Sequence, residues 1–182
     1  MKYVALLRGV NVGGKTLVKM ADLKQAVEAL GYSNVRTYIN SGNILFETAK
    51  RDTLRLRKQI ETAIETTFEL AVKVVVIDEH SYKKIIKNMP PGWGGKDGWK
   101  YNLLFLIPPY DIDTIMQDIG ELKPDIEVVE PGEGVIYQAV LFEKFGRTTS
   151  GKLASRGSYK QMTIRNNNTA MKLLGLLEDM NP

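Results

Sequence analysis

Short apolar runs and amphipathic stretches follow one another along the first half of the chain. Four segments rich in β-branched and aromatic residues predict strands, at 3–8, 35–40, 43–47 and 72–78. Apolar residues recur at helical spacing over 20–30 and 54–70, which predicts two amphipathic helices. The resulting order, strand–helix–strand–strand–helix–strand, is that of a ferredoxin-like βαββαβ unit. Ser41–Gly42, between the second and third strands, predicts a two-residue hairpin and therefore an antiparallel pair.

The pattern starts again after a stretch rich in Gly and Pro. Strands are predicted at 101–107, 126–129, 135–142 and 162–165. Helices are predicted at 112–122 and 169–180, with a short helix inside 144–160. We therefore expect an α+β protein made of two ferredoxin-like subdomains with extra helices. The expected divisions are the first subdomain with a linking helix, a Gly/Pro-rich linker, and the second subdomain with the C-terminal helix, at 1–89, 90–100 and 101–182.

Two of these strands lack the usual alternation of apolar and polar residues. Residues 72–77 and 103–107 are apolar on nearly every position, which predicts sheets covered on both faces. RNA-recognition modules share the ferredoxin-like order but need an open sheet face where exposed aromatic rings stack with bases. The strands therefore do not favour that class of RNA-binding protein.

The composition excludes several kinds of chemistry. The 182 residues contain no Cys and one His, which excludes disulfides, thiolate ligands, Cys nucleophiles and a multi-histidine zinc site. Ser41 lacks a suitable histidine base, so no catalytic residue is predicted and enzymatic activity is left open. No metal and no cofactor is expected. The apolar start ends at Arg8, and no apolar run reaches the roughly 18 residues of a membrane span, so we expect a cytoplasmic protein with no membrane partner.

Charge is segregated along the chain, although the formal net charge is only +4. Residues 1–21 and 144–172 contain Lys and Arg but no acid, whereas 111–143 contains nine acids and the single base Lys123. Such blocks create local fields that the net charge conceals. One interpretation is a set of solvated faces whose opposite charges pair across the fold. The other is that the two acid-free segments meet and form a basic cleft for an anion.

The segment Gly9–Thr16 fits the phosphate-loop pattern GxxxxGK[ST] and follows a strand. In such loops backbone amides cradle phosphates, the Lys reaches the terminal ones and the hydroxyl holds magnesium. Residues 74–79 resemble the apolar strand that ends in a metal-binding Asp. A phosphate-loop hydrolase needs a parallel sheet, however, and the Ser41–Gly42 hairpin predicts antiparallel strands. Magnesium-dependent nucleotide hydrolysis is therefore kept as an alternative function.

Three motifs suggest a family. They are LLRGVNVGGK at Leu6–Lys15, TYINSGN at Thr37–Asn43 and TIRN at Thr163–Asn166. Together with Met20, Leu23, Thr169 and Lys172–Leu174, they resemble the bacterial DUF1697 family, a domain of unknown function. The resemblance spans nearly the whole chain and implies two ferredoxin-like subdomains, but it implies no function. The family often has Asn where this chain has Thr16, and usually Trp where it has Asn167.

Polar and basic residues gather at what we call the loop–turn corner, formed by residues 8–15 and 40–43. In a βαββαβ sheet the end of the first strand lies beside the start of the third, so this loop and this turn should be neighbours. Glycines there let backbone amides approach an anion. The predicted ligand-binding residues are Arg8, Asn11, Gly13, Gly14, Lys15, Asn40, Ser41 and Asn43, joined by Arg147, Lys152, Arg165 and Asn166 if the second acid-free segment reaches them.

Each of these residues also has a structural explanation. Asn and Ser stabilise turns by bonding to their own backbone, and Arg165–Asn166 can be a strand end followed by the N-cap of the last helix. The leading hypothesis is a binding protein for an anionic ligand, a nucleotide or nucleic acid. The alternatives are the nucleotide hydrolase and a self-association module, for which the largely apolar last helix would provide a homodimer interface.

Overall fold

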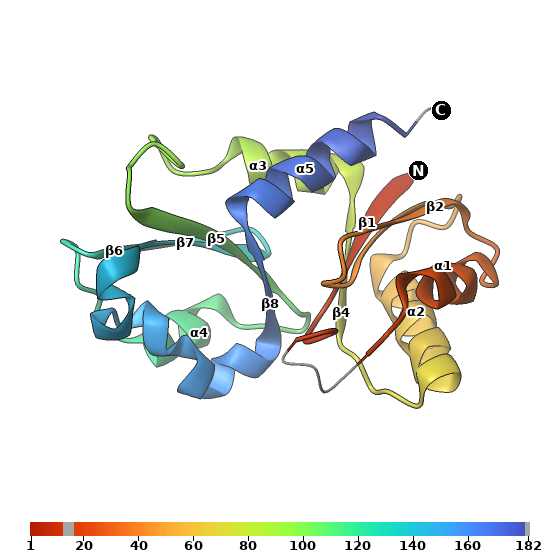
Figure 1. Ribbon diagram of the computed structural model, residues 1–182, viewed down its shortest axis with the longest axis horizontal. Coiled ribbons are helices and arrows are strands. Elements are labelled where there is room, and N and C mark those ends of the chain that lie inside the picture. The colour runs from red at the N-terminus through yellow and green to blue at the C-terminus, as the bar shows by residue number, and fades with distance from the viewer. Residues whose placement is uncertain (13–16, 181–182) are drawn as a thin grey trace. The chain divides into compact units, whose positions relative to one another are not determined.

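The computed structural model describes residues 1–12 and 17–180, which form an α+β protein with two four-stranded antiparallel sheets (Figure 1). The chain divides into two units, the first made of Met1–Lys84 with the residues from Lys172 onward, and the second made of Ile85–Met171. The division falls inside two helices, α3 (Glu79–Lys87) and α5 (Asn167–Glu178). Each unit contains one of the two sheets.

The first unit has the predicted βαββαβ order. Its elements are β1 (Lys2–Leu7), α1 (Met20–Glu28), β2 (Ser33–Tyr38), β3 (Asn43–Glu47), α2 (Thr53–Phe68) and β4 (Val74–Asp78). The strands are arranged β2-β3-β1-β4, and every neighbouring pair is antiparallel. Helices α1 and α2 lie together on one face of this sheet (Figure 1).

The central strand β1 explains how this unit is held together. Tyr3, Ala5 and Leu7 point into the core that α1 and α2 cover, and all three are fully buried. Val4 and Leu6, on the opposite face, are fully buried too. The residues at 103–107 in the second unit are buried too, so the prediction of a strand covered on both faces is confirmed there, whereas at 72–77 Lys73 is exposed and Val76 is half-buried.

The hairpin between β2 and β3 is antiparallel as predicted, but its turn is longer than predicted. Strand β2 ends at Tyr38 and β3 begins at Asn43, so four residues rather than two connect them. Ile39 has φ 47° and Gly42 has φ 72°, both in the left-handed region. A Cβ at Gly42 would lie 2.7 Å from Leu7 Cβ, so only glycine fits this turn against β1.

The second unit repeats the strand arrangement as β6-β7-β5-β8. Its elements are β5 (Trp99–Leu106), α4 (Ile112–Ile119), β6 (Glu127–Gly132), β7 (Val135–Leu141) and β8 (Met162–Asn166). Where one short helix was predicted, three 3-10 helices connect β7 to β8: η1 (Phe142–Arg147), η2 (Ser150–Ser155) and η3 (Gly157–Gln161). Strand β5 begins two residues before its predicted start.

A buried carboxylate holds this connection in place. Glu127 is 1% exposed, and its oxygens accept hydrogen bonds from the amides of Lys123, Thr149 and Ser150 and from the Ser150 hydroxyl, at 2.6–3.0 Å. Burial raises the pKa of Glu127, but these four hydrogen bonds outweigh it and hold the pKa below its ordinary value. The 3-10 connection is therefore attached to the sheet through a charged group.

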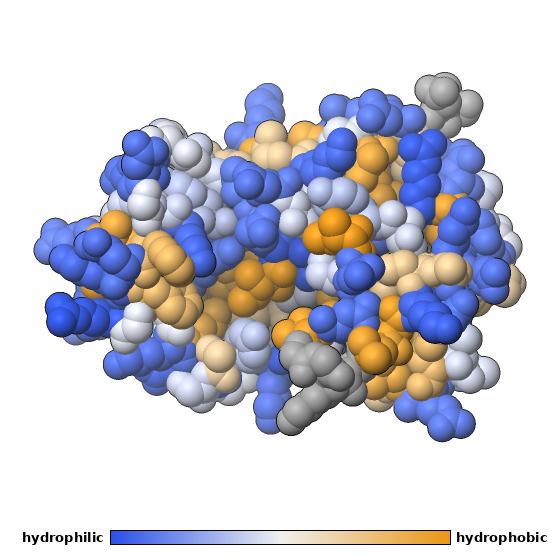
Figure 2. All heavy atoms as spheres, in the orientation of Figure 1, coloured by the Kyte–Doolittle hydropathy of each residue, from blue (hydrophilic) through white to orange (hydrophobic). Residues whose placement is uncertain are grey.

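The surface of both units is largely hydrophilic on the face shown in Figure 2, with hydrophobic side chains among the polar ones. In the described part of the chain, no helix combines the length and apolar character needed to cross a membrane. Three of the exposed large apolar residues lie close to the loop–turn corner in sequence, namely Val12, Leu17 and Ile39.

Candidate functional site

The loop after β1 lies beside the β2–β3 turn, as the topology predicted. Leu7 N donates to Gly42 O at 2.8 Å, and the Asn11 side-chain amide donates to Asn40 O at 2.7 Å. Gly13, Gly14 and Lys15, which were predicted to bind the ligand, lie outside the described residues, and so does Thr16. The described part of the loop–turn corner is therefore built by residues 8–12 and 40–43.

Asn11 uses its whole amide to hold the corner together. Besides the bond to Asn40 O, its Nδ2 donates to Val18 O at 2.9 Å and its Oδ1 accepts from Val18 N at 2.8 Å. Its backbone has φ 55°, a conformation that Asn tolerates better than most residues. Asn11 thus joins the two ends of the loop and fixes both against the turn.

Asn43 has a similar role on the other side. Its side chain is fully buried, and its Nδ2 donates to Tyr38 O and to Ser41 Oγ, both at 3.0 Å. These bonds close the four-residue turn, as the structural explanation proposed for Asn and Ser in turns. Asn40, by contrast, is exposed, and Ser41 is half-buried.

Arg8 is half-buried at the end of β1, and the register of the sheet brings a second cation to it. Leu7 pairs with Val74, and Arg8 N donates to Lys73 O at 2.9 Å. Lys73 was not among the residues predicted from the sequence to lie near this corner. The signal was present, because the last strand of a βαββαβ unit lies antiparallel beside the first, so the residue before β4 must approach the residue after β1.

The loop–turn corner and the residues that adjoin it are basic and carry exposed apolar side chains. Residues 8–12 and 40–43, together with the adjoining residues 7, 17–19, 39 and 73, contain Arg8, Lys19 and Lys73 but no acid. Val12, Leu17 and Ile39 are 67%, 83% and 48% exposed. Ile39 is β-branched and has a positive φ, which is a strained combination that persists only where the surroundings impose it.

The fold does not provide the parallel sheet that the phosphate-loop alternative requires. All strand pairs in the first sheet are antiparallel, whereas a phosphate-loop hydrolase requires a parallel sheet. Asp78, at the position of the metal-binding Asp, accepts from Ser81 N at 3.0 Å and from Ser81 Oγ at 2.7 Å. Burial raises the pKa of Asp78, but these hydrogen bonds outweigh it and lower the pKa below its ordinary value. Asp78 therefore caps the start of α3.

The four predicted residues of the second acid-free segment lie in the second unit. Arg147 and Lys152 are exposed. Arg165 is 6% exposed, and its Nη1 donates to Thr163 Oγ1 and Ile164 O, on its own strand. Asn166 Oδ1 accepts from Thr169 N at 2.8 Å, which is the helix cap expected as the alternative. A basic cleft shared with the loop–turn corner stays a prediction.

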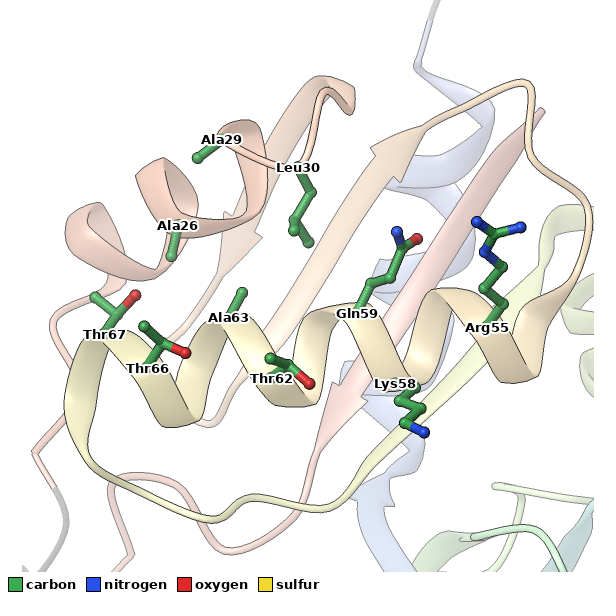
Figure 3. Close-up of a pocket in the computed structure, with 10 residues that line it drawn as sticks. All are labelled: Ala26, Ala29, Leu30, Arg55, Lys58, Gln59, Thr62, Ala63, Thr66 and Thr67. Carbon is green, nitrogen blue, oxygen red and sulfur yellow. The ribbon is translucent and has the colours of Figure 1, made fainter.

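A groove of about 540 Å³ lies between α1 and α2, on the side of the helices away from the sheet (Figure 3). Small side chains from both helices form most of its lining, including Ala26, Ala29 and Ala63. Arg55 and Lys58 stand near one end of α2, and no acid belongs to the lining. None of the predicted site residues that the structure describes contributes to this groove.

Comparisons with known proteins point to one family. The model described as "Protein of unknown function (DUF1697)" matches residues 1–137. Among solved structures, the chain is similar to a conserved bacterial protein from Streptococcus pneumoniae, with 29% identity and a TM-score of 0.86 over 97% of this chain and 98% of that chain. No curated protein matches the chain. Asn167, at the position where the sequence departs from the Trp usual in the family, accepts a hydrogen bond from Trp93 Nε1 at 3.1 Å.

Proposed function

The chain belongs to the DUF1697 family of proteins of unknown function, and we propose that it binds a phosphate-bearing ligand, nucleic acid rather than a free nucleotide, at the loop–turn corner. The observation that carries the proposal is the hydrogen-bonded junction of three segments. Leu7 bonds to Gly42, Asn11 to Asn40 and Arg8 to Lys73, so the loop, the turn and the start of β4 form one surface. A surface held together in this way presents its side chains in a fixed arrangement, which lowers the entropic cost of binding.

The charge of this surface supports an anionic ligand. Arg8, Lys19 and Lys73 belong to its segments, and no carboxylate in those segments competes with a bound phosphate. Arg can donate two parallel hydrogen bonds to a phosphate, and Lys contributes a point charge. The corner therefore has the groups that phosphate recognition requires.

The exposed apolar residues favour a polymer over a single phosphate group. Val12, Leu17 and Ile39 lie on the same segments as the cations and have substantial exposed area. A single-stranded nucleic acid presents bases and sugars between its charged phosphates, so it can contact apolar and basic side chains together. This is the form of the proposal that the experiment tests.

The test is fluorescence anisotropy of a labelled single-stranded oligonucleotide. The wild-type protein should bind it with an affinity that falls steeply with salt. Arg8→Gln combined with Lys73→Gln should weaken binding about tenfold or more and reduce the salt slope by about 1 for each phosphate contact removed. Lys24→Gln combined with Lys58→Gln makes the same change in charge on α1 and α2, and it should leave the affinity nearly unchanged.

Arg8 is half-buried, so replacing it can affect folding as well as binding. Lys73 is exposed, and Lys73→Gln alone therefore tests the surface with little risk to folding. The proposal is wrong if the wild-type protein does not bind at low salt, if the affinity does not depend on salt, or if the corner and control variants weaken binding equally.

A further inference from the structure

A polar pocket of about 490 Å³ lies within the second unit, where β8 ends and α5 begins. Four asparagines, two lysines, two aromatic residues and Gly94 line it, and the lining includes no acid. Its volume lies within the roughly 300–1,000 Å³ of typical small-molecule sites. Of the predicted ligand-binding residues that the structure describes, only Asn166 contributes to it.

The unequal lengths of two neighbouring strands create this pocket. Asn102 of β5 pairs with Asn166 of β8, and β8 ends there because the chain continues into α5. Strand β5 extends three residues further, and Trp99, Lys100 and Tyr101 have register partners in β7 alone. The space beside this extension is bounded by the start of α5 and by the Gly-rich segment around Gly94.

The internal hydrogen bonds leave the amide donors of Asn166 and Asn167 to the pocket, whereas Asn102 uses its own Nδ2 to donate to Gln138 Oε1 at 2.9 Å. Asn166 Oδ1 accepts from Thr169 N, and Asn167 Oδ1 accepts from Trp93 Nε1. Each amide is thereby oriented with its oxygen occupied, so its Nδ2 group is the part that remains for a ligand. Asn168 is exposed at the next position of α5. Amide donors of this kind, with no acid beside them, suit phosphate oxygens.

Lys96 lies beside the aromatic residues of the pocket, whereas Lys100 Nζ lies 3.5 Å from the centre of the Phe142 ring, outside the lining. Lys96 Nζ lies 4.9 Å from the centre of the Trp99 ring, and Lys96 N donates to Tyr101 Oη at 3.0 Å. Tyr101 is held in turn by an edge-to-face contact with Trp93, at 5.0 Å between ring centres. Trp99 is half-buried, so it offers a flat surface of fixed position beside a cation.

We propose that this pocket binds a mononucleotide-sized phosphate ester that carries a planar ring. The ring packs on Trp99, and the phosphate is held by Lys96 and by the Nδ2 groups of Asn166 and Asn168. The site is separate from the loop–turn corner and does not depend on nucleic-acid binding there. It takes a small ligand because it is a bounded pocket, whereas the corner presents exposed segments.

The two tryptophans make the test direct, because the chain has only Trp93 and Trp99. In Trp93→Phe, fluorescence reports on Trp99 alone. We would titrate this variant with adenosine 5′-monophosphate, ribose 5-phosphate, adenosine and inorganic phosphate. The monophosphate should quench Trp99 saturably, and it should bind at least tenfold more tightly than ribose 5-phosphate or adenosine, because each of these lacks one of the two contacts.

Asn168→Asp tests the phosphate contact without weakening the helix. An acid in the first turn of α5 favours the helix dipole but repels a bound phosphate, so affinity for the monophosphate should fall at least tenfold with no loss of thermal stability. Gln117→Glu, on the exposed side of α4, makes the same amide-to-acid change away from the pocket and should leave affinity unchanged. Because Trp93→Phe also removes the hydrogen bond to Asn167 Oδ1, wild-type protein and Trp99→Phe are compared as well, and the quenching must disappear in the second.

Three results would overturn the assignment. They are the absence of saturable quenching by the monophosphate at millimolar concentration, equal affinity for ribose 5-phosphate, and equal weakening by Asn168→Asp and Gln117→Glu. Measuring oligonucleotide binding to Asn168→Asp by fluorescence anisotropy tells the two proposed sites apart. Binding at the loop–turn corner should be unaffected by this change, so either proposal can fail without the other.

Discussion

The two units share one strand arrangement but differ in how the chain returns from the third strand to the fourth. In the first unit the connection is α2, a helix of 16 residues. In the second it consists of the three 3-10 helices η1, η2 and η3. The topology therefore does not require an α-helix at this place. It requires a connection that covers the sheet and satisfies its own backbone polar groups.

The first connection depends on apolar burial. Leu56, Ile60 and Ile64 recur every four residues along α2 and are fully buried against the sheet and α1. The helix satisfies its own backbone, and Asp52 accepts from Arg55 N at 3.0 Å to cap its start. The stability of this unit should accordingly follow the apolar area of the helix.

The second connection depends on polar anchors. It contributes Leu153 to the core, while Glu127 and Asp118 accept hydrogen bonds from the amides of Thr149, Ser150 and Ser158. Both carboxylates come from the acid-rich block 111–143, and the amides come from the acid-free block. In this part of the molecule, carboxylates of the acid-rich block accept hydrogen bonds from backbone amides of the acid-free block.

Removing the side chain of Glu127, the polar anchor of the second connection, should have the largest effect on the free energy of unfolding. Glu127→Ala leaves four donors without their acceptor, and at about 1 kcal/mol or more for each donor the free energy of unfolding should fall by about 4 kcal/mol. Urea unfolding followed by circular dichroism measures this. Glu130→Ala, at an exposed position of the same strand, is the control and should change the value by less than about 0.5 kcal/mol. Equal effects of the two variants would contradict the anchor.

Truncating one of the buried apolar residues of α2 should have the next largest effect on the free energy of unfolding. Ile60→Ala removes a fully buried side chain and should cost about 3 kcal/mol, within the range typical of such truncations. The measurement is again urea unfolding, with Lys58→Ala on the exposed side of α2 as the control. If Ile60→Ala lowers the free energy of unfolding by less than the control does, the buried apolar residues of α2 do not stabilise the first unit.

Acid should distinguish the two connections. The pKa of Glu127 is lower in the folded state than in the unfolded chain, so the stability it contributes is fully present above the unfolded-state pKa and is lost as the pH falls through the folded-state value. Hydrogen exchange should show the amides of Thr149 and Ser150 losing protection at acidic pH before those of α2. Glu127→Gln should make the stability of the second unit less dependent on pH, and an unchanged dependence would refute this assignment.

Loss of the Asn11 side chain should have a smaller effect, confined to the loop–turn corner. Asn11→Gly keeps the positive φ and removes three hydrogen bonds, but these are exposed or part-buried, so the groups left behind can bond to water and the free energy of unfolding should fall by only about 1–2 kcal/mol. Asn11→Ala adds the strain of a positive φ and should be less stable than Asn11→Gly. The reverse order in thermal unfolding would show that the side-chain bonds do not hold the loop.

The smallest effect is expected at the helix cap of the second unit. Asn166→Ala should lower stability by about 1 kcal/mol, because Thr169 N loses its acceptor. Asn166→Asp keeps an acceptor at this position and should be close to wild type. A cost as large as that of Glu127→Ala would mean that Asn166 has a further structural role.

The element order, the antiparallel pairing and the closeness of the loop and the turn could be predicted because they depend on local patterns. Apolar periodicity defines each element, and few topologies accommodate the resulting order. The 3-10 connection could not be predicted, because its anchor Glu127 acts on Thr149 and Ser150, 22 and 23 residues away. The pocket at Asn166–Asn168 was missed for a related reason, since it depends on how far β5 extends past β8.

The Glu127 anchor also has a consequence for the order of folding. Helix α2 can begin to form from contacts within its own 16 residues. The turns at Thr149 and Ser150 have their acceptor only after β6 is in place, so that part of the connection depends on a distant segment of the chain. Contacts of long sequence separation form slowly because the loop must close first. The two units, although alike in topology, should therefore complete their second connections at different stages of folding, the helical one early and the carboxylate-anchored one late.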